Sequence, residues 1–180
     1  MATVNRIHIF GAAGSGSTTL ANALVPYGFS HIEVDEAMFE PSDPPFLKRR
    51  TEKETLDYLL NQLHQTQKAV ISGAMVGFGD RLKPTIDLFV FLHIPTHIRI
   101  ERIKERERKR FGTRVDLGGD MYQMHMDFLA WVKAYESGDE TVRSLAQHKK
   151  WLQDVSKPII EITEALPVDQ IVARILPYLR

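Results

Sequence analysis

The residues with the clearest chemistry lie in segment 10–19, which reads FGAAGSGSTT. Gly11, Gly16 and Thr18 fit the pattern G-x-x-x-x-G-K-[ST], in which backbone N–H groups surround phosphate oxygens. Ser17 stands where that pattern has lysine, and a lost donor of this kind costs about 3–4 kcal/mol of transition-state stabilisation. The segment therefore predicts a phosphate site that needs a positive charge from elsewhere; the alternative is a glycine turn made for packing alone.

ATP with Mg²⁺ is the ligand that this pattern predicts, because a helix N-terminus and a glycine turn together favour an anion. Thr18 fills the Ser/Thr slot, whose hydroxyl binds Mg²⁺ in such loops; the alternative is an ordinary residue of a first helical turn. The predicted nucleotide-binding residues are Gly11, Ala13, Gly14, Ser15, Gly16, Ser17, Thr18 and Thr19.

Arginines gather in segment 96–114 and are the obvious source of the missing charge. Guanidinium groups suit this task because they stay charged and hold phosphate oxygens in pairs. Glutamates are interleaved with them, so the alternative is a solvated helix with salt bridges between successive turns. The arginines that recur at helical spacing on one predicted face are Arg99, Arg102, Arg106 and Arg110.

Candidate acceptor-binding residues follow the second and third predicted strands. Asp35 comes at the carboxyl end of a strand, where open parallel sheets bind ligands; the alternative is a loop aspartate that caps the next turn. Gly73 would let the backbone approach a substrate, and Asp80 would be a second acid. Arg49 lies in the basic run 48–50, which predicts either an anion site or a solvated basic cluster.

Apolar runs alternate with helix-like runs along the whole chain. This alternation predicts an α/β fold with a parallel sheet and right-handed crossovers, in one domain spanning residues 1–180. Segment 111–120 holds three glycines and is expected to be mobile. The predicted strands are 6–10, 29–34, 69–72, 88–94 and 158–162, and the predicted helices are 18–27, 51–67, 96–110, 121–137, 140–155 and 168–179.

Composition excludes several kinds of partner and chemistry. The formal net charge is zero, from 23 basic and 23 acidic residues, which gives no support to a nucleic-acid partner. The 180 residues include no cysteine, so disulfides and thiolate catalysis are excluded. No apolar run approaches the roughly 20 residues of a membrane span, and the N-terminus lacks a signal pattern. We therefore expect a cytoplasmic protein without a membrane partner.

In the order of these motifs along the chain, the protein resembles P-loop kinases of the nucleoside-monophosphate-kinase and shikimate-kinase type. More narrowly, it resembles bacterial adenylate-kinase-like P-loop proteins whose loops also lack the lysine. The resemblance implies a three-layer P-loop NTPase fold, with a five-stranded parallel sheet in the order 2-3-1-4-5, helices on both faces and a helical lid near residues 102–122. It covers nearly the whole length and is carried by the glycine loop, Asp35, Ser72-Gly73, Pro95-Thr96, the arginine-rich segment 99–110 and Pro167-Val168.

The resemblance also implies roles for individual residues. Arg102 and Arg106 follow the fourth strand, where the family carries its lid arginines, and would be catalytic contacts to the phosphates. Asp35 would be catalytic by orienting an acceptor hydroxyl, or would hold Mg²⁺ through water. The acceptor would bind near Arg49, Gly73 and Asp80.

The combined prediction is an ATP-dependent small-molecule phosphotransferase, nucleoside-monophosphate-kinase-like, with Mg²⁺ as cofactor. Its ligands would be a nucleotide and a small-molecule acceptor. The first alternative is a non-catalytic nucleotide-binding protein, in which Ser17 marks the loss of phosphoryl transfer. The second alternative is an interaction module without a ligand.

Overall fold

A five-stranded parallel sheet forms the centre of the computed structural model, which describes residues 3–179. The strands lie in the order β2-β5-β1-β6-β7, and counting these five along the chain gives 2-3-1-4-5, so the predicted fold is confirmed. In register, Ile9 of β1 lies between Ser72 of β5 and Val90 of β6. The strands are β1 (Arg6–Gly11), β2 (Ser30–Glu33), β5 (Ala69–Ser72), β6 (Leu88–Leu92) and β7 (Ile159–Ile162).

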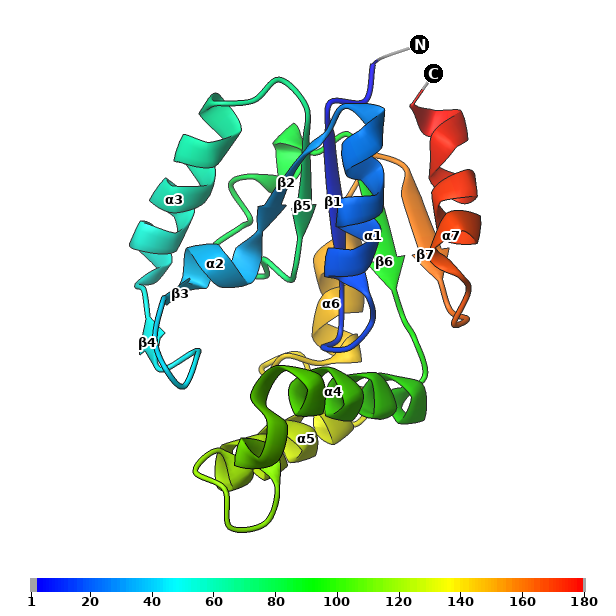
Figure 1. Cartoon of the computed structure of the whole chain (residues 1–180). Helices are drawn as coiled ribbons and strands as arrows, with labels where there is room; N and C mark the ends of the chain where they lie inside the picture. Colours follow the sequence, from blue (N-terminus) through cyan, green and yellow to red (C-terminus); the bar gives the residue numbers. More distant parts are fainter. Residues whose placement is uncertain (1–2, 180) are drawn as a thin grey trace.

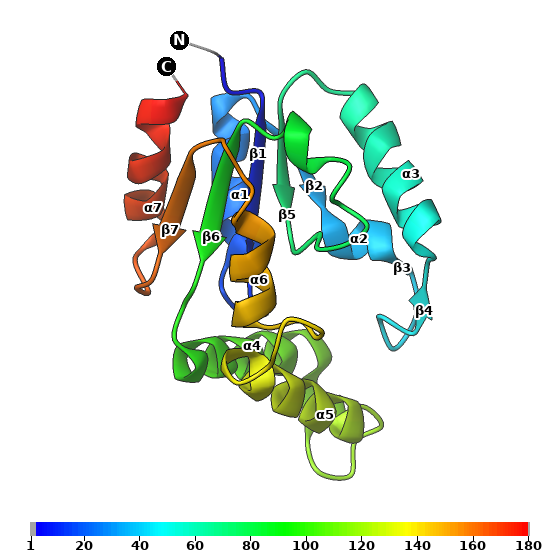
Figure 2. The same cartoon turned by 180° about the vertical axis from the view of Figure 1, so that it is seen from behind.

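Helices cover both faces of the sheet (Figures 1 and 2). Leu20 of the first helix and Ile175 of the last pack with β1 and β6 on one face, whereas Leu59 and Trp151 pack on the other. Every residue of β6 is buried, as expected for a central strand covered on both sides. The helices are α1 (Ser17–Leu24), α2 (Val34–Met38), α3 (Glu52–His64), α4 (Thr96–Phe111), α5 (Tyr122–Lys133), α6 (Leu145–Leu152) and α7 (Val168–Ile175).

Local capping chemistry sets the helix ends. Thr51 caps α3 in a capping box with Glu54, and Gly28 ends the first helical segment with a φ of 89°. The helix predicted over 140–155 was wrong at its start, because the Ser144 hydroxyl accepts the Gln147 N–H and α6 begins only at Leu145. The helix predicted over 121–137 ends earlier, at Lys133, and continues as a short 3₁₀ turn.

A short helix and a short hairpin that follow β2 were not predicted. The five-residue helix α2 follows β2 directly, and the two-residue strands β3 (Phe39–Glu40) and β4 (Lys48–Arg49) form an antiparallel hairpin after it. Both lie beyond the carboxyl end of β2, where a ligand of a parallel sheet would bind. The hairpin contains Arg49, one of the predicted acceptor residues.

The carboxyl ends of the strands meet the loop between β1 and α1, and α4 crosses beneath them (Figure 1). Helix α5 packs along α4 and lies on its far side from the sheet, as seen in both views (Figures 1 and 2). This arrangement brings Arg99 and Arg102 of α4 against the glycine loop. Within residues 3–179, no helix has the length and apolar character needed to span a bilayer.

Candidate functional site

The glycine loop adopts backbone angles that other residues rarely adopt. Gly14 and Gly16 have φ values of 80° and 96°, in the left-handed region. A Cβ at Gly14 would lie 2.6 Å from the Arg99 carbonyl oxygen, so this glycine also permits close contact with α4. The first N–H groups of α1, which begins at Ser17, have no acceptor within the helix and face the loop. These backbone angles are compatible with the predicted phosphate-binding loop.

Ser15 provides evidence that the loop fits a phosphate ligand. Ser15 is 5% exposed, and its hydroxyl oxygen has no hydrogen-bond partner among residues 3–179. A buried polar group without a partner costs roughly 1–3 kcal/mol. A phosphate oxygen within the loop would remove this cost.

Arg102 places a positive charge on the loop. Its Nη1 donates to the carbonyl oxygens of Ser15 at 3.3 Å and Gly14 at 3.4 Å. Both contacts are long, and the guanidinium group retains other N–H donors. Arg102 therefore brings a cation to the loop beside Gly14 and Ser15, and its role as a phosphate contact stays a prediction.

Arg99 belongs to the same helix face but is held in protein contacts. It is fully buried and donates to the carbonyl oxygens of Ala13 at 3.2 Å and Ile94 at 2.9 Å. Its Nη2 donates to the Thr96 hydroxyl and lies 3.6 Å from a carboxylate oxygen of Glu136. Arg99 therefore positions the loop from below and is not free to bind a ligand.

Arg106 and Arg110 are exposed and lie farther along α4. The Arg106 guanidinium is 3.7 Å from the Glu107 carboxylate, and Arg110 lies over the neighbouring Phe111 ring. Lys104 pairs with Glu101 at 2.9 Å, so the salt-bridged surface considered as the alternative also exists on this helix. The structure divides the arginine stripe between loop contacts at one end and solvent at the other.

Thr18 and Glu33 bring two oxygen groups together beside the loop. The Thr18 hydroxyl donates to Glu33 Oε1 at 2.9 Å. Hydroxyl and carboxylate oxygens, with phosphates and water, are the donors that suit Mg²⁺. Residues 3–179 contain no cluster of three or more His, Asp or Glu side chains that could hold a metal alone. Sequence reasoning missed Glu33, although its position at the end of β2, two residues before Asp35, was a usable signal.

Asp35 lies in the first turn of α2 and faces a second cation, Arg143. Surrounding protein displaces water and raises the pKa of Asp35, although the side chain keeps contact with solvent; the Arg143 charge opposes this rise. The Arg143 Nη2 is 3.5 Å from the Gly11 carbonyl oxygen, and its guanidinium lies over the Trp131 ring at 5.3 Å.

Arg143 is a cation beside Gly11, and its hydrogen-bond donors are incompletely paired within residues 3–179. Its Nε atom is buried and has no partner within the described chain. Burial lowers the pKa of Arg143, whereas Asp35 raises it. Sequence reasoning could not place Arg143, because it comes from the segment before α6, 132 residues beyond Gly11.

The three predicted acceptor residues lie on different segments of the chain. Gly73 lies against α2, since a Cβ there would be 2.8 Å from the Val34 Cβ, next to Asp35. Arg49 is exposed in the β3–β4 hairpin. Asp80 accepts the Trp151 indole N–H at 2.5 Å, on the α6 side of the sheet. The structure thus brings Gly73 to Asp35, and the acceptor roles of Arg49 and Asp80 stay predictions.

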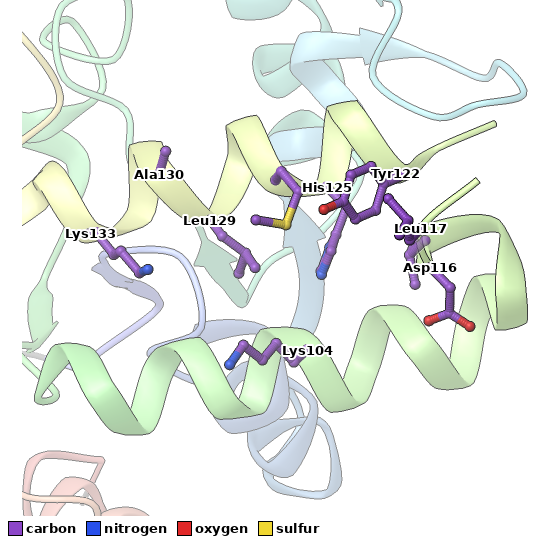
Figure 3. Close-up of a pocket in the computed structure, with 10 residues that line it drawn as sticks. Lys104, Asp116, Leu117, Tyr122, His125, Leu129, Ala130 and Lys133 are labelled. Carbon is purple, nitrogen blue, oxygen red and sulfur yellow. The ribbon is translucent and has the colours of Figure 1, made fainter. Parts of the chain in front are cut away.

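A separate hollow of about 460 Å³ lies between α4 and α5 (Figure 3). Lys104, His125, Leu129 and Lys133 are among its lining residues, and none of the loop residues is. His125 Nδ1 is held by Glu107 at 2.5 Å. This hollow is distinct from the loop site, and we assign it no catalytic role.

Sequence comparison shows the family to which the chain belongs. A family model described as "AAA domain" matches residues 7–116. The chain is 39% identical to "Uncharacterized protein YqaC" of Bacillus subtilis (strain 168) over 176 residues, covering 96% of each chain.

Two solved structures are similar in fold. A gluconokinase from Sinorhizobium meliloti 1021 has a TM-score of 0.56 and 19% identity, covering 99% of this chain and 93% of that one. A shikimate kinase from Acinetobacter baumannii in complex with shikimate has a TM-score of 0.54 and 15% identity, covering 97% and 94%. The protein therefore belongs to the AAA-domain family of P-loop proteins that includes YqaC, with the fold of P-loop kinases of the nucleoside-monophosphate-kinase and shikimate-kinase type.

Proposed function

We propose that the protein is an ATP-dependent phosphotransferase that acts on a small molecule, in the manner of a nucleoside-monophosphate kinase. The observation that carries this proposal is the contact of Arg102 with the loop that lacks its lysine. Phosphoryl transfer requires positioning and charge neutralisation more than covalent participation by the protein. Arg102 would supply the positive charge, and the loop amides would hold the phosphates in position.

Thr18 and Glu33 would hold Mg²⁺ together with the phosphates and water, and Asp35 would contribute through a water molecule. Bound Mg²⁺ would neutralise charge on the phosphate oxygens. Arg106 and the segment 102–122 would form the lid of a single domain 1–180 and close over the nucleotide. Closure would exclude water and prevent hydrolysis of ATP without an acceptor.

The acceptor would lie between Asp35 and Arg143. Asp35 would accept a hydrogen bond from the reacting hydroxyl, and its raised pKa would favour proton uptake during transfer. Arg143 has a buried donor that finds no partner among residues 3–179, and it would bind an anionic group of the acceptor, carboxylate or phosphate. The exposed Arg49 and the backbone at Gly73 would border the same space.

An acceptor assay tests the proposal. ADP release from ATP would be measured with Mg²⁺ and gluconate, shikimate, AMP or dAMP as acceptors. We expect acceptor-dependent ADP release that Asp35→Asn reduces by about 100-fold or more, the scale of a lost general base. The matched control is Asp57→Asn, an exposed carboxylate on α3 that pairs with Lys53. Equal rates for the wild type and Asp35→Asn would contradict the assignment.

A second candidate function, a non-catalytic nucleotide-binding protein, is favoured by Ser17 at the lysine position. It predicts nucleotide binding with no ADP release from any of these acceptors. Arg102→Ala separates the two candidates further. For a kinase it would reduce turnover at saturating ATP as well as affinity, whereas for a binding protein affinity alone would fall.

A further inference from the structure

Trp131 is a half-exposed tryptophan on α5 whose ring carries the guanidinium group of Arg143. The Arg143 Cζ atom lies over the Trp131 ring, 5.3 Å from its centroid, and 43% of Trp131 is exposed. Single exposed apolar side chains are common on protein surfaces and need no role. This one is different because its arginine comes from the segment between α5 and α6, which leads back to the sheet (Figure 2).

The other contacts of Arg143 hold its side chain only weakly. Its Nη2 is 3.5 Å from the Gly11 carbonyl oxygen, which is long for a hydrogen bond, and its buried Nε has no partner within residues 3–179. None of the ion pairs among these residues includes Arg143. The Trp131 ring is therefore the contact that orients the Arg143 guanidinium.

Arg99 shows the opposite arrangement. It also lies over an aromatic ring, 5.1 Å from the centroid of Tyr135, but two carbonyl oxygens and a hydroxyl accept its N–H donors. A cation–π contact holds a guanidinium by its charge and uses no N–H donor, whereas a carboxylate partner would accept these donors in pairs. Arg143 on Trp131 is thus held with donors to spare, as an anion-binding arginine requires.

The Trp131 ring is itself fixed relative to the glycine loop. It stacks on Phe128, with ring centroids 5.8 Å apart and planes at 23°. Phe128 and the loop residue Ala13 pack against the same apolar cluster between α4 and α5. Trp131 therefore refers the position of Arg143 to the helices that also carry Arg102.

We propose that Trp131 is a positioning residue, whose ring holds the Arg143 guanidinium beside Gly11 with its N–H donors free for the anionic group of the acceptor. The inference rests on the proposed function, because the anion belongs to the acceptor of phosphoryl transfer. Trp131 acts through Arg143 and touches no reacting atom.

Inorganic phosphate titrated into ¹⁵N-labelled protein tests this inference, with the Arg143 Nε–H resonance as the readout. Arg143→Lys identifies that resonance by its loss, and the shift reports phosphate at this arginine separately from the glycine loop. We expect Trp131→Leu, which keeps apolar bulk without a π face, to weaken phosphate binding about tenfold. Trp131→Phe keeps an aromatic face and should stay within about threefold of wild type.

Met126→Leu is the matched control, because Met126 lies on the same helix and is also 43% exposed. We expect it to stay within about twofold of wild type, as for an ordinary surface substitution. Equal affinities for Trp131→Leu and wild type would overturn the inference, and so would equal losses in Trp131→Leu and Trp131→Phe, which mark a packing role alone. A wild-type Nε–H resonance that phosphate does not shift would also overturn it, and this result needs no variant.

Two further outcomes separate the inference from the proposed function. A phosphate response that disappears when Mg-ADP is added would assign Arg143 to the nucleotide and overturn the inference. If no acceptor yields ADP release, while phosphate still shifts the Arg143 resonance and Trp131→Leu still weakens that binding, the proposed function fails. The acceptor role of Arg143 then fails with it, and the anion site held by Trp131 stands.

Discussion

Replacing Arg102 with alanine tests whether this arginine supplies the charge that the loop lacks. Its Nη1 already lies 3.3–3.4 Å from loop oxygens, and a Cβ at Gly16 would be 3.7 Å from it. Two unit charges about 4 Å apart interact by about 4 kcal/mol at an effective dielectric constant of 20. Desolvation and side-chain ordering offset part of this, and hydrogen bonds to charged groups contribute about 1.5–3 kcal/mol net. We therefore expect ADP affinity to fall about 10- to 150-fold.

The assay is calorimetry of Mg-ADP binding at fixed ionic strength, since exposed charge interactions are screened by salt. Arg110→Ala is the matched control, because Arg110 lies on the same face of α4 but is exposed over Phe111. We expect the control to stay within about twofold of wild type. Adding Ser17→Lys to Arg102→Ala should restore part of the affinity, because the cation returns to the loop itself. An Arg102→Ala protein that binds Mg-ADP as tightly as wild type would refute the reasoning.

Three further predictions concern stability. Gly14→Ala should lower the unfolding free energy more than Gly28→Ala; both have positive φ, but only the former meets a backbone oxygen, and the left-handed cost alone is about 1–2 kcal/mol. Thr51→Ala should cost about 1 kcal/mol in urea unfolding, because it removes a capping box. Burial lowers the pKa of His8 to about 4 and of His148 to about 3, so the unfolded chain binds more protons below pH 6.5. The free energy of unfolding should therefore fall by about 4 kcal/mol from pH 6.5 to 4.5 through these two groups, and His8→Phe should remove about half of that change.

Each of these predictions has a clear contrary result. Equal losses of stability for the two glycine variants would show that the close approach to α4 is not a constraint. A Thr51→Ala protein with unchanged stability would mean that the Glu54 side chain satisfies the helix end alone. A slope of stability against pH that is the same with and without His8 would contradict its burial as a neutral ring.

Much of the fold could be predicted from local sequence patterns. The glycine loop was predictable because Gly14 and Gly16 need positive φ and follow a strand directly. The strand at 69–72 was predicted at its observed limits, because all four of its residues are buried in a short run. Helix α2 was not predictable, since five residues carry no helical period; packing of Val34 and Ala37 against the core holds it in place.

The site depends on contacts that sequence spacing does not encode. Glu33 and Asp35 are both acidic and lie two residues apart, so the sequence does not distinguish them. In the structure, it is Glu33 that accepts the hydrogen bond from Thr18. The arginine stripe was visible in the sequence, but burial separates Arg99, held by protein carbonyls, from Arg102, which faces the loop. The approach of Arg143 to Gly11 depends on the path of the whole chain, and no local pattern marks it.

In the proposed function, segment 11–18 binds nucleotide phosphates. Its most direct test is calorimetry of Mg-ATP and Mg-ADP on wild type and Gly16→Val, with circular dichroism to confirm that both are folded. Valine at Gly16 would be strained at a φ of 96° and would place methyl groups toward Arg102. We predict micromolar binding by the wild type and none by Gly16→Val. No wild-type binding, with binding restored by Ser17→Lys, would contradict the claim and show that the loop has lost its nucleotide.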